Sequence, residues 1–131
     1  MIIYPLTSLA IVLALIVYFA LGYVVGQARG TWNVTAPATS GHIEFDKRYR
    51  VHMNTLEQLV LFIPAAMLAA PVLGDPVTAG LGLVWSLARV AFARAYYVDP
   101  AKRGPGFTVA LLVTAVLAVA AIVGAVRVLI G

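Results

Sequence analysis

Four long apolar segments dominate the sequence and limit the chain to a few architectures. They cover about residues 4–25, 47–73, 76–98 and 106–130, with charges at only a few positions inside them. About 20 apolar residues in a helix are enough to cross the hydrocarbon core of a bilayer. A chain of 131 residues with 63% hydrophobic and 11% charged side chains cannot bury so much apolar surface in a soluble core. The sequence therefore predicts an all-α integral membrane protein.

The connections between these segments predict how the helices are arranged. Residues 27–44 contain Pro, Gly, Asn, Ser and Thr in a proportion that is typical of loops. Residues 74–76 predict a tight turn, and residues 99–106 predict a break between the third and fourth helices. Short connections make consecutive helices antiparallel neighbours. We expect a single domain over residues 1–131, folded as an up-down four-helix bundle.

The distribution of charge predicts the orientation in the membrane. The net charge is +4, from nine Lys and Arg against five Asp and Glu. The first and third connections and their flanks carry most of the basic residues, which are Arg29, Lys47, Arg48, Arg94, Lys102 and Arg103. Because basic loops are retained in the cytoplasm, we expect these two loops to be cytoplasmic and both termini to lie on the opposite side. There is no basic tail or aromatic-basic RNA motif, so no nucleic-acid partner is expected.

The second apolar segment begins with polar side chains on two faces. With Arg50 set to zero at about 100° per residue, Lys47 lies near about +60°, Asn54 near about +40° and Glu57 near about −20°, and these four residues form one stripe. Arg48 and His52 lie on the opposite side, near about 160° and 200°. An ionised group at the bilayer centre costs at least about 2.5–3.5 kcal/mol, so neither face suits lipid. We expect the bundle to cover one face, and a second subunit or a water-filled cleft to cover the other.

The third segment carries a second stripe of candidate site residues. Arg89, Phe92 and Tyr96 are spaced i, i+3 and i+7, and therefore share one helix face. If the second and third helices are antiparallel, Arg89 is the expected ion-pair partner of Glu57. Arg103 follows in the next connection, where the alternative is a cation that binds lipid headgroups; the same alternative holds for the basic residues that begin the second segment.

One end of the predicted bundle therefore gathers a cationic set of side chains with one carboxylate and one amide. Its members are Arg29, Arg50, Asn54, Glu57, Arg89, Tyr96 and Arg103. Arginine binds carboxylates through two parallel hydrogen bonds, and nearby guanidinium groups lower a thiol pKa from about 8.5. The chain has no cysteine, and therefore no thiolate metal site or thiol nucleophile of its own. The residues predict a small anionic ligand with carboxylates and an ammonium group, and they would also favour a ligand thiolate.

Two segments resemble the family of membrane-associated proteins in eicosanoid and glutathione metabolism (MAPEG). Residues 44–57, EFDKRYRVHMNTLE, are similar to the family pattern Glu-Phe-acidic-basic-x-Tyr-Arg-x-(Gln/His)-x-Asn-x-x-Glu. Residues 89–103 are similar to its Arg-x-x-Tyr-x-x-x-Tyr segment and the Arg seven residues later, with Phe92 in place of the first Tyr. The resemblance extends over nearly the whole chain.

The resemblance implies a homotrimer that binds glutathione between neighbouring subunits near the cytosolic face of the membrane. The residues carried over as glutathione contacts are Arg29, Arg50, His52, Asn54, Glu57, Arg89, Tyr96 and Arg103. His52 would reach the ligand of an adjacent subunit. Arg103, assisted by Tyr96, would stabilise the glutathione thiolate for attack on a lipophilic electrophile that arrives from the bilayer lipids. No metal is implied.

We therefore expect a membrane glutathione transferase of general detoxification type, with reduction of lipid hydroperoxides as an accompanying activity. Two alternatives stay open. The first is a non-catalytic protein that binds glutathione or lipid. The second is a small transporter in which Glu57 couples a substrate to protons, although the surrounding arginines disfavour a cationic substrate.

Overall fold

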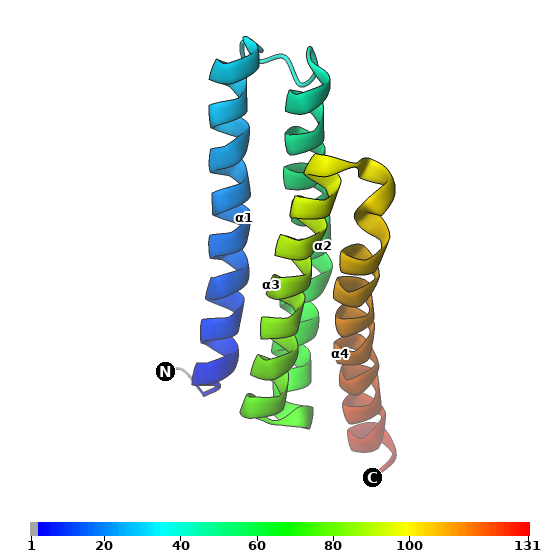
Figure 1. The fold of residues 1–131 in the computed structure, drawn as a ribbon. Helices are drawn as coiled ribbons and strands as arrows, with labels where there is room; N and C mark the ends of the chain where they lie inside the picture. Colours follow the sequence, from blue (N-terminus) through cyan, green and yellow to red (C-terminus); the bar gives the residue numbers. More distant parts are fainter. Residues whose placement is uncertain (1–2) are drawn as a thin grey trace.

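The computed structural model describes residues 3–131, which form four long helices. These are α1 (Pro5–Trp32), α2 (Ile43–Leu73), α3 (Asp75–Val98) and α4 (Gly104–Ile130), with a short 3-10 helix, η1 (Pro100–Arg103), before α4. The helices run alternately up and down (Figure 1). All four are long and apolar enough to cross a membrane, and the described residues contain no strand. The prediction of an all-α, four-helix membrane bundle is confirmed.

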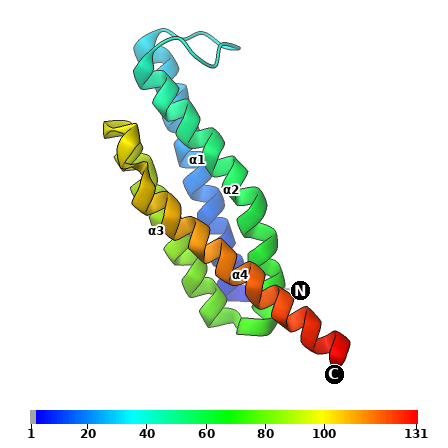
Figure 2. The same ribbon diagram turned by 90° about the vertical axis from the view of Figure 1, so that its right-hand side faces the viewer.

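The α2–α3 pair forms the centre of the bundle. α1 packs against one side of this pair and α4 against the other side, as Figures 1 and 2 show from two directions. Between α2 and α3 the rings of Phe62 and Trp85 stack with centroids 4.5 Å apart. Buried alanines of α2 and α4, among them Ala66, Ala69 and Ala110, allow the backbones to approach closely. Residues on the facing sides of α2 and α3 are therefore held in a packed, rigid core.

α1 and α2 are longer at their connected ends than the sequence predicted. α1 continues to Trp32, where Asn33 adopts a left-handed conformation (φ 54°) and ends it, and α2 begins at Ile43, capped by the side chain of His42. Their 28 and 31 residues correspond to about 42 and 46 Å, against about 30 Å of hydrocarbon. Both helices extend beyond the α3–α4 connection (Figure 1). Arg29 therefore lies on a helix and not in a loop.

A close approach between α3 and the start of α4 depends on Gly106. A Cβ atom at this position would lie 2.6 Å from the backbone nitrogen of Phe92, a distance that side chains do not tolerate. The glycine lets α4 cross directly over α3. As a result Phe107 packs beside Phe92 with ring centroids 6.2 Å apart, and Arg103 is brought to the same place in the bundle.

The N-terminus of α1 is capped by a residue of α3. α1 has no side-chain cap of its own, and the carboxylate of Asp75 instead accepts hydrogen bonds from the backbone nitrogens of Leu6 (2.9 Å) and Thr7 (2.7 Å). Two free N–H groups of a first turn are thereby paired with an acidic group, which the helix dipole also favours. This contact fixes α1 to the α2–α3 turn at the end opposite the long connection.

Replacing the bridging carboxylate tests this cap. We expect Asp75→Ala to lower the melting temperature, because two N–H groups of the first turn of α1 lose their acceptor, and Asp75→Asn to lower it less because an acceptor oxygen is kept. Thermal unfolding in detergent measures the difference. Asp46→Ala is the matched control, since Asp46 makes only local hydrogen bonds to Ser40 and Gly41. Equal losses in the two alanine variants would contradict a special role for Asp75.

Candidate functional site

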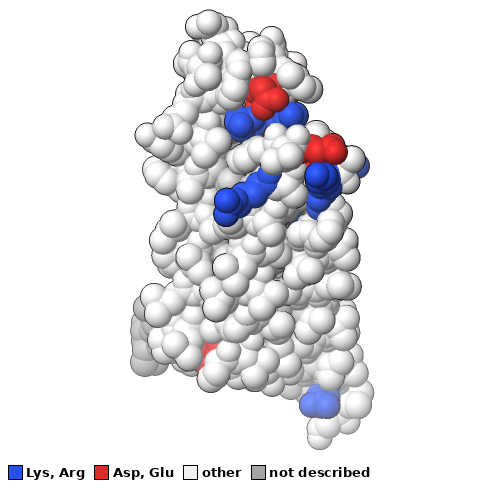
Figure 3. Space-filling model, in the orientation of Figure 1, with Lys and Arg blue, Asp and Glu red and all other residues white. Residues whose placement is uncertain are grey.

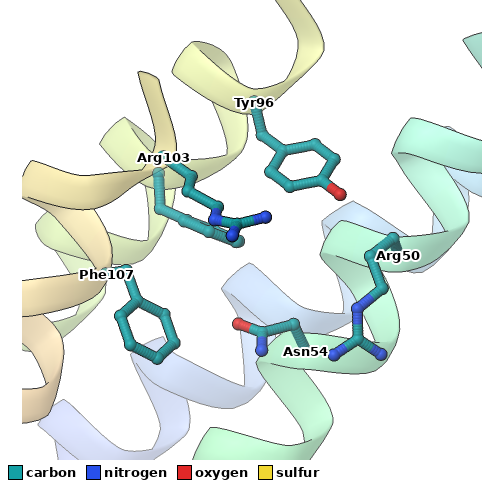
Figure 4. A pocket seen from close by; sticks show the side chains of 6 residues that line it. Arg50, Asn54, Tyr96, Arg103 and Phe107 are labelled. Atoms are coloured by element: carbon teal, nitrogen blue, oxygen red, sulfur yellow. The ribbon is translucent and has the colours of Figure 1, made fainter. Parts of the chain in front are cut away.

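A pocket of about 300 Å³ opens between α2, α3, η1 and α4, near the end of the bundle where α3 finishes. Its lining residues are Arg50, Asn54, Phe92, Tyr96, Arg103 and Phe107. Figure 4 shows Tyr96 and Arg103 facing Arg50 and Asn54 across a common space, with Phe107 at one side. The volume lies at the lower limit of the range of about 300–1,000 Å³ for small-molecule sites. Four residues that the sequence assigned to one site therefore meet in one pocket, while their roles in binding stay predictions.

An ion pair at the edge of the pocket joins Arg50 to Glu57. The two guanidinium nitrogens lie 3.2 and 3.3 Å from the two carboxylate oxygens, because seven residues, or two turns, separate them on α2. The amide nitrogen of Asn54 donates to the same carboxylate at 3.4 Å. Both charged side chains are more than half exposed, so the pair contributes little stability. A zwitterionic ligand could replace this pairing at low cost.

Arg89 lies behind Asn54 in the α2–α3 interface and does not line the pocket. Its side chain is fully buried, and one guanidinium nitrogen donates to the amide oxygen of Asn54 (2.8 Å) and to the hydroxyl of Thr55 (2.9 Å). The guanidinium carbon lies 4.1 Å from the centroid of the Phe92 ring. These contacts hold the Asn54 oxygen inward, and the Asn54 amide group is left to face Glu57. Arg89 thus orients a pocket residue from outside the pocket.

The predicted ion pair between Glu57 and Arg89 is wrong. Glu57 pairs with Arg50, and Arg89 binds neutral groups. The helical angles give the reason: Asn54 near about 40° and its neighbour Thr55 near about 140° flank the direction of α3, whereas Glu57 near about −20° points away from it. The antiparallel arrangement of α2 and α3 was predicted correctly. Two residues at the same depth along neighbouring helices do not, however, have to lie on the surfaces by which the helices face each other.

Arg103 and Tyr96 approach the pocket from the opposite wall. Arg103 is the last residue of η1, whose start is capped by the carboxylate of Asp99 through the nitrogen of Ala101 (3.0 Å). Arg103 takes part in none of the three ion pairs between residues 3 and 131. Tyr96 packs against Phe92 with ring centroids 5.6 Å apart. A guanidinium group and a phenol therefore face the pocket together, and the cation has no protein carboxylate beside it.

Arg29 and His52 do not reach the pocket of their own chain. The guanidinium group of Arg29 donates to the carbonyl oxygens of Val34 (3.3 Å) and Ala38 (2.7 Å), and so holds the connection between α1 and α2. His52 lies on the opposite face of α2, where its ring stacks on Tyr18 of α1 at 4.4 Å. Within one chain, these two predicted contacts have structural partners instead.

The second polar face of α2 is covered by the chain's own helices, as one of the two faces was expected to be. Arg48 lies between the rings of Trp32 and Tyr97, each 4.8 Å from its guanidinium carbon, and pairs with Glu44 at 2.8 Å. Lys47 binds the same carboxylate at 2.9 Å. The face with Arg50 and Glu57 is left open.

Sequence reasoning missed Phe107 as a wall of the pocket and Thr55 as a partner of Arg89. Phe107 belongs to a uniformly apolar segment, and its position after Gly106 was its only signal. Thr55 was overshadowed by the charged residues around it, although its position next to Asn54 places it toward α3. Phe92 was placed on the right stripe, and it supplies both the cover of Arg89 and part of the apolar wall.

Comparison with known proteins places the chain in a family. An uncharacterized protein of Synechocystis sp., sll1147, is 39% identical over 115 residues, covering 88% of this chain and 84% of that protein. Microsomal glutathione S-transferase 2 of Bos taurus is 34% identical over 107 residues, covering 82% and 72%. Leukotriene C4 synthase of Rattus norvegicus is 32% identical over 79 residues, covering 60% and 51%. The model of the MAPEG family matches residues 7–123, from the first turn of α1 into α4, and the chain therefore belongs to the MAPEG family.

Proposed function

We propose that this protein is a homotrimeric integral membrane glutathione transferase that conjugates glutathione to lipophilic electrophiles. The observation that carries the proposal is the pocket in which Arg50, Asn54, Tyr96 and Arg103 converge beside two phenyl rings. The names of the MAPEG relatives, a microsomal glutathione S-transferase and a leukotriene C4 synthase, support a glutathione-dependent reaction. A polar wall and an apolar wall in one pocket suit a water-soluble thiol and a membrane-soluble electrophile.

The polar wall complements the charges of glutathione. The peptide carries two carboxylates and one ammonium group, and the exposed Arg50–Glu57 pair offers one cation and one anion at adjacent positions. A ligand carboxylate would bind Arg50 through two hydrogen bonds, while the ligand ammonium group would bind Glu57. Asn54, with its oxygen held by Arg89, would donate its amide hydrogens to the ligand.

Arg103 is the proposed stabiliser of the reactive sulfur. A guanidinium group without a protein carboxylate attracts the thiolate and lowers the pKa of the bound thiol below about 8.5. The Tyr96 hydroxyl adds a hydrogen-bond donor. The thiolate sulfur then forms a bond to the electrophilic carbon as the leaving group departs with its electron pair, and no covalent enzyme intermediate is needed. With a lipid hydroperoxide the same thiolate would attack the terminal oxygen and release the alcohol, and a second glutathione would complete the disulfide and release water.

Assembly explains the two predicted contacts that lie outside the pocket. The face of α2 with Arg50 and Glu57 is open in a single chain, and lipid cannot cover ionised groups. In the proposed homotrimer a neighbouring subunit covers this face, and Arg29 and His52 of that neighbour contribute to the site. The basic first and third connections are cytoplasmic in this arrangement, so that glutathione enters from the cytosol and both termini lie on the other side.

Removing the Arg103 guanidinium group is the main test. We expect Arg103→Ala to lower kcat for conjugation of glutathione to a model aryl halide by about 10²–10³-fold, the usual effect of losing one group that stabilises a developing or reacting anion. Because the thiolate is the reactive form, the rise of activity with pH should move to higher pH in the variant, toward about 8.5. Stopped-flow absorbance of the conjugate against pH measures both effects.

Lys102→Ala is the matched control for this experiment. Lys102 is the neighbouring exposed cation and does not line the pocket, so its removal should leave kcat and the pH profile in place. Equal losses in both variants would show a diffuse electrostatic effect. Glutathione binding without turnover in the wild type would favour the non-catalytic alternative, and proton-coupled uptake into liposomes that Glu57→Gln abolishes would favour the transporter.

Arg89 offers a second test because it acts through Asn54. We expect Arg89→Met to raise the KM for glutathione about tenfold, equivalent to the loss of one hydrogen bond to a charged group, with a smaller change in kcat. Arg89→Lys should recover part of the loss. Because the methionine variant leaves the Asn54 oxygen without its partner in the α2–α3 interface, the temperature of thermal unfolding should fall as well. A lower melting temperature with an unchanged KM would assign Arg89 a purely structural role.

A further inference from the structure

A second hollow of the molecule is an apolar groove between α1 and α3, with a volume of about 270 Å³. Side chains from residues 16–24 of α1 and 90–97 of α3 line it, and none of them lines the polar pocket. The small side chains of Ala20 and Ala93 leave room between the larger aliphatic groups. Arg94 is the one charged residue in its lining.

The dimensions of the groove match a lipid chain. The α1 residues that line it extend over about 12 Å along the helix axis, and one leaflet of hydrocarbon is about 15 Å deep. The groove is therefore long enough to hold most of the part of an acyl chain that lies in one leaflet. Tyr97, the last residue but one of α3, lines the groove, and its hydroxyl is buried without a partner among the described residues, so this group is not presented to a ligand. The surface of the groove is apolar, and Arg94 lines it with the aliphatic part of its side chain.

No carboxylate on either helix of the groove can neutralise Arg94. The side chain is exposed and takes part in none of the three ion pairs between residues 3 and 131. α1 contains no Asp or Glu, and the single acidic residue of α3, Asp75, is at the opposite end of the helix. Arg94 thus presents an unpaired cation at the edge of an apolar groove.

The position of Arg94 along α3 places it near a membrane surface. It lies four residues before the helix ends at Val98, and Lys102 follows in η1. In Figure 3 basic side chains, with acidic side chains beside some of them, gather at this end of the bundle, while the middle of the same face shows no charge. Cations at this depth lie at the level of the lipid headgroups, and anionic headgroups attract them.

We propose that the α1–α3 groove binds one anionic phospholipid of the surrounding bilayer. An acyl chain lies along the groove over Ala20 and Ala93, and the phosphate of the headgroup binds the Arg94 guanidinium through two hydrogen bonds. A headgroup without a compensating ammonium group is preferred, because Arg94 has no other counter-ion. This site is separate from the glutathione pocket, so its test is independent of the transferase proposal.

Competition between two lipids with identical acyl chains tests the proposal. The delipidated protein in detergent is mixed with equal amounts of phosphatidylglycerol and phosphatidylcholine, and native mass spectrometry counts the bound lipids. We expect the wild type to retain phosphatidylglycerol about fivefold more than phosphatidylcholine. Arg94→Gln should bring the ratio to about one, whereas Lys102→Gln, which removes a cation outside the groove, should leave the preference in place.

A second variant tests the groove itself. Ala20→Phe should fill the hollow and reduce the retention of both lipids, and circular dichroism confirms that the helices are intact. Equal effects of Arg94→Gln and Lys102→Gln would assign the preference to diffuse charge and overturn the proposal. Displacement of phosphatidylglycerol by oleate at equal concentration would identify a fatty acid as the ligand, and displacement by inorganic phosphate would make the acyl chain irrelevant. Either result would also overturn the proposal.

Discussion

The buried guanidinium group of Arg89 is the constraint on which the arrangement of the central helices depends. A cation that crosses into an apolar bundle is costly unless polar groups surround it, and lipid offers none. Asn54 and Thr55 on α2 bind one guanidinium nitrogen of Arg89, and the ring of Phe92 packs against the group, while Nε and Nη1 are buried without a hydrogen-bond partner among the described residues. These contacts join α2 to α3 inside the bundle. Asn54 also lines the pocket with Arg50 and Tyr96, so the residue that binds the buried charge belongs to the polar wall of the pocket.

The two polar faces of α2 have different surroundings. This difference determines which face of the helix is turned toward another subunit or a ligand. On one face, rings of α1 and α3 pack against Arg48, and Tyr18 of α1 stacks on His52. On the other face an ion pair of Arg50 and Glu57 is more than half exposed in a segment of the chain that belongs to a membrane protein. An open ionic face of this kind is compatible with water or with protein, but not with lipid tails. Both the neighbouring subunit of the proposed trimer and the proposed ligand would keep lipid tails away from this ionic face.

The sequence was sufficient for the properties that depend on periodicity and insufficient for those that depend on geometry across helices. The four helices and the stripe of Arg50, Asn54 and Glu57 followed from hydrophobic pattern and helical angle. The end of α1 was misplaced because glycines near it suggested a loop, whereas the helix ends at the left-handed Asn33. The partner of Arg89 could not be predicted, because it depends on which side chains of α2 face α3 within about 60°. Phe107 was missed because it lies in a uniformly apolar segment, where nothing in the sequence distinguishes it from its neighbours.

The composition of the pocket, with a polar wall and an apolar wall, suits a position where water and lipid meet. Arg50, Asn54 and Arg103 are side chains that water-soluble anions bind, and they lie near the end of the bundle where α1 and α2 extend past the membrane thickness. Phe92 and Phe107 form the wall toward the apolar part of α3 and α4. A nucleophile held by the polar wall and an electrophile dissolved in lipid would otherwise be separated by the interface itself. In the proposed transferase, holding the sulfur at this boundary would replace a rare encounter between two phases with a short, oriented approach, and orientation of this kind supplies a large part of a catalytic rate.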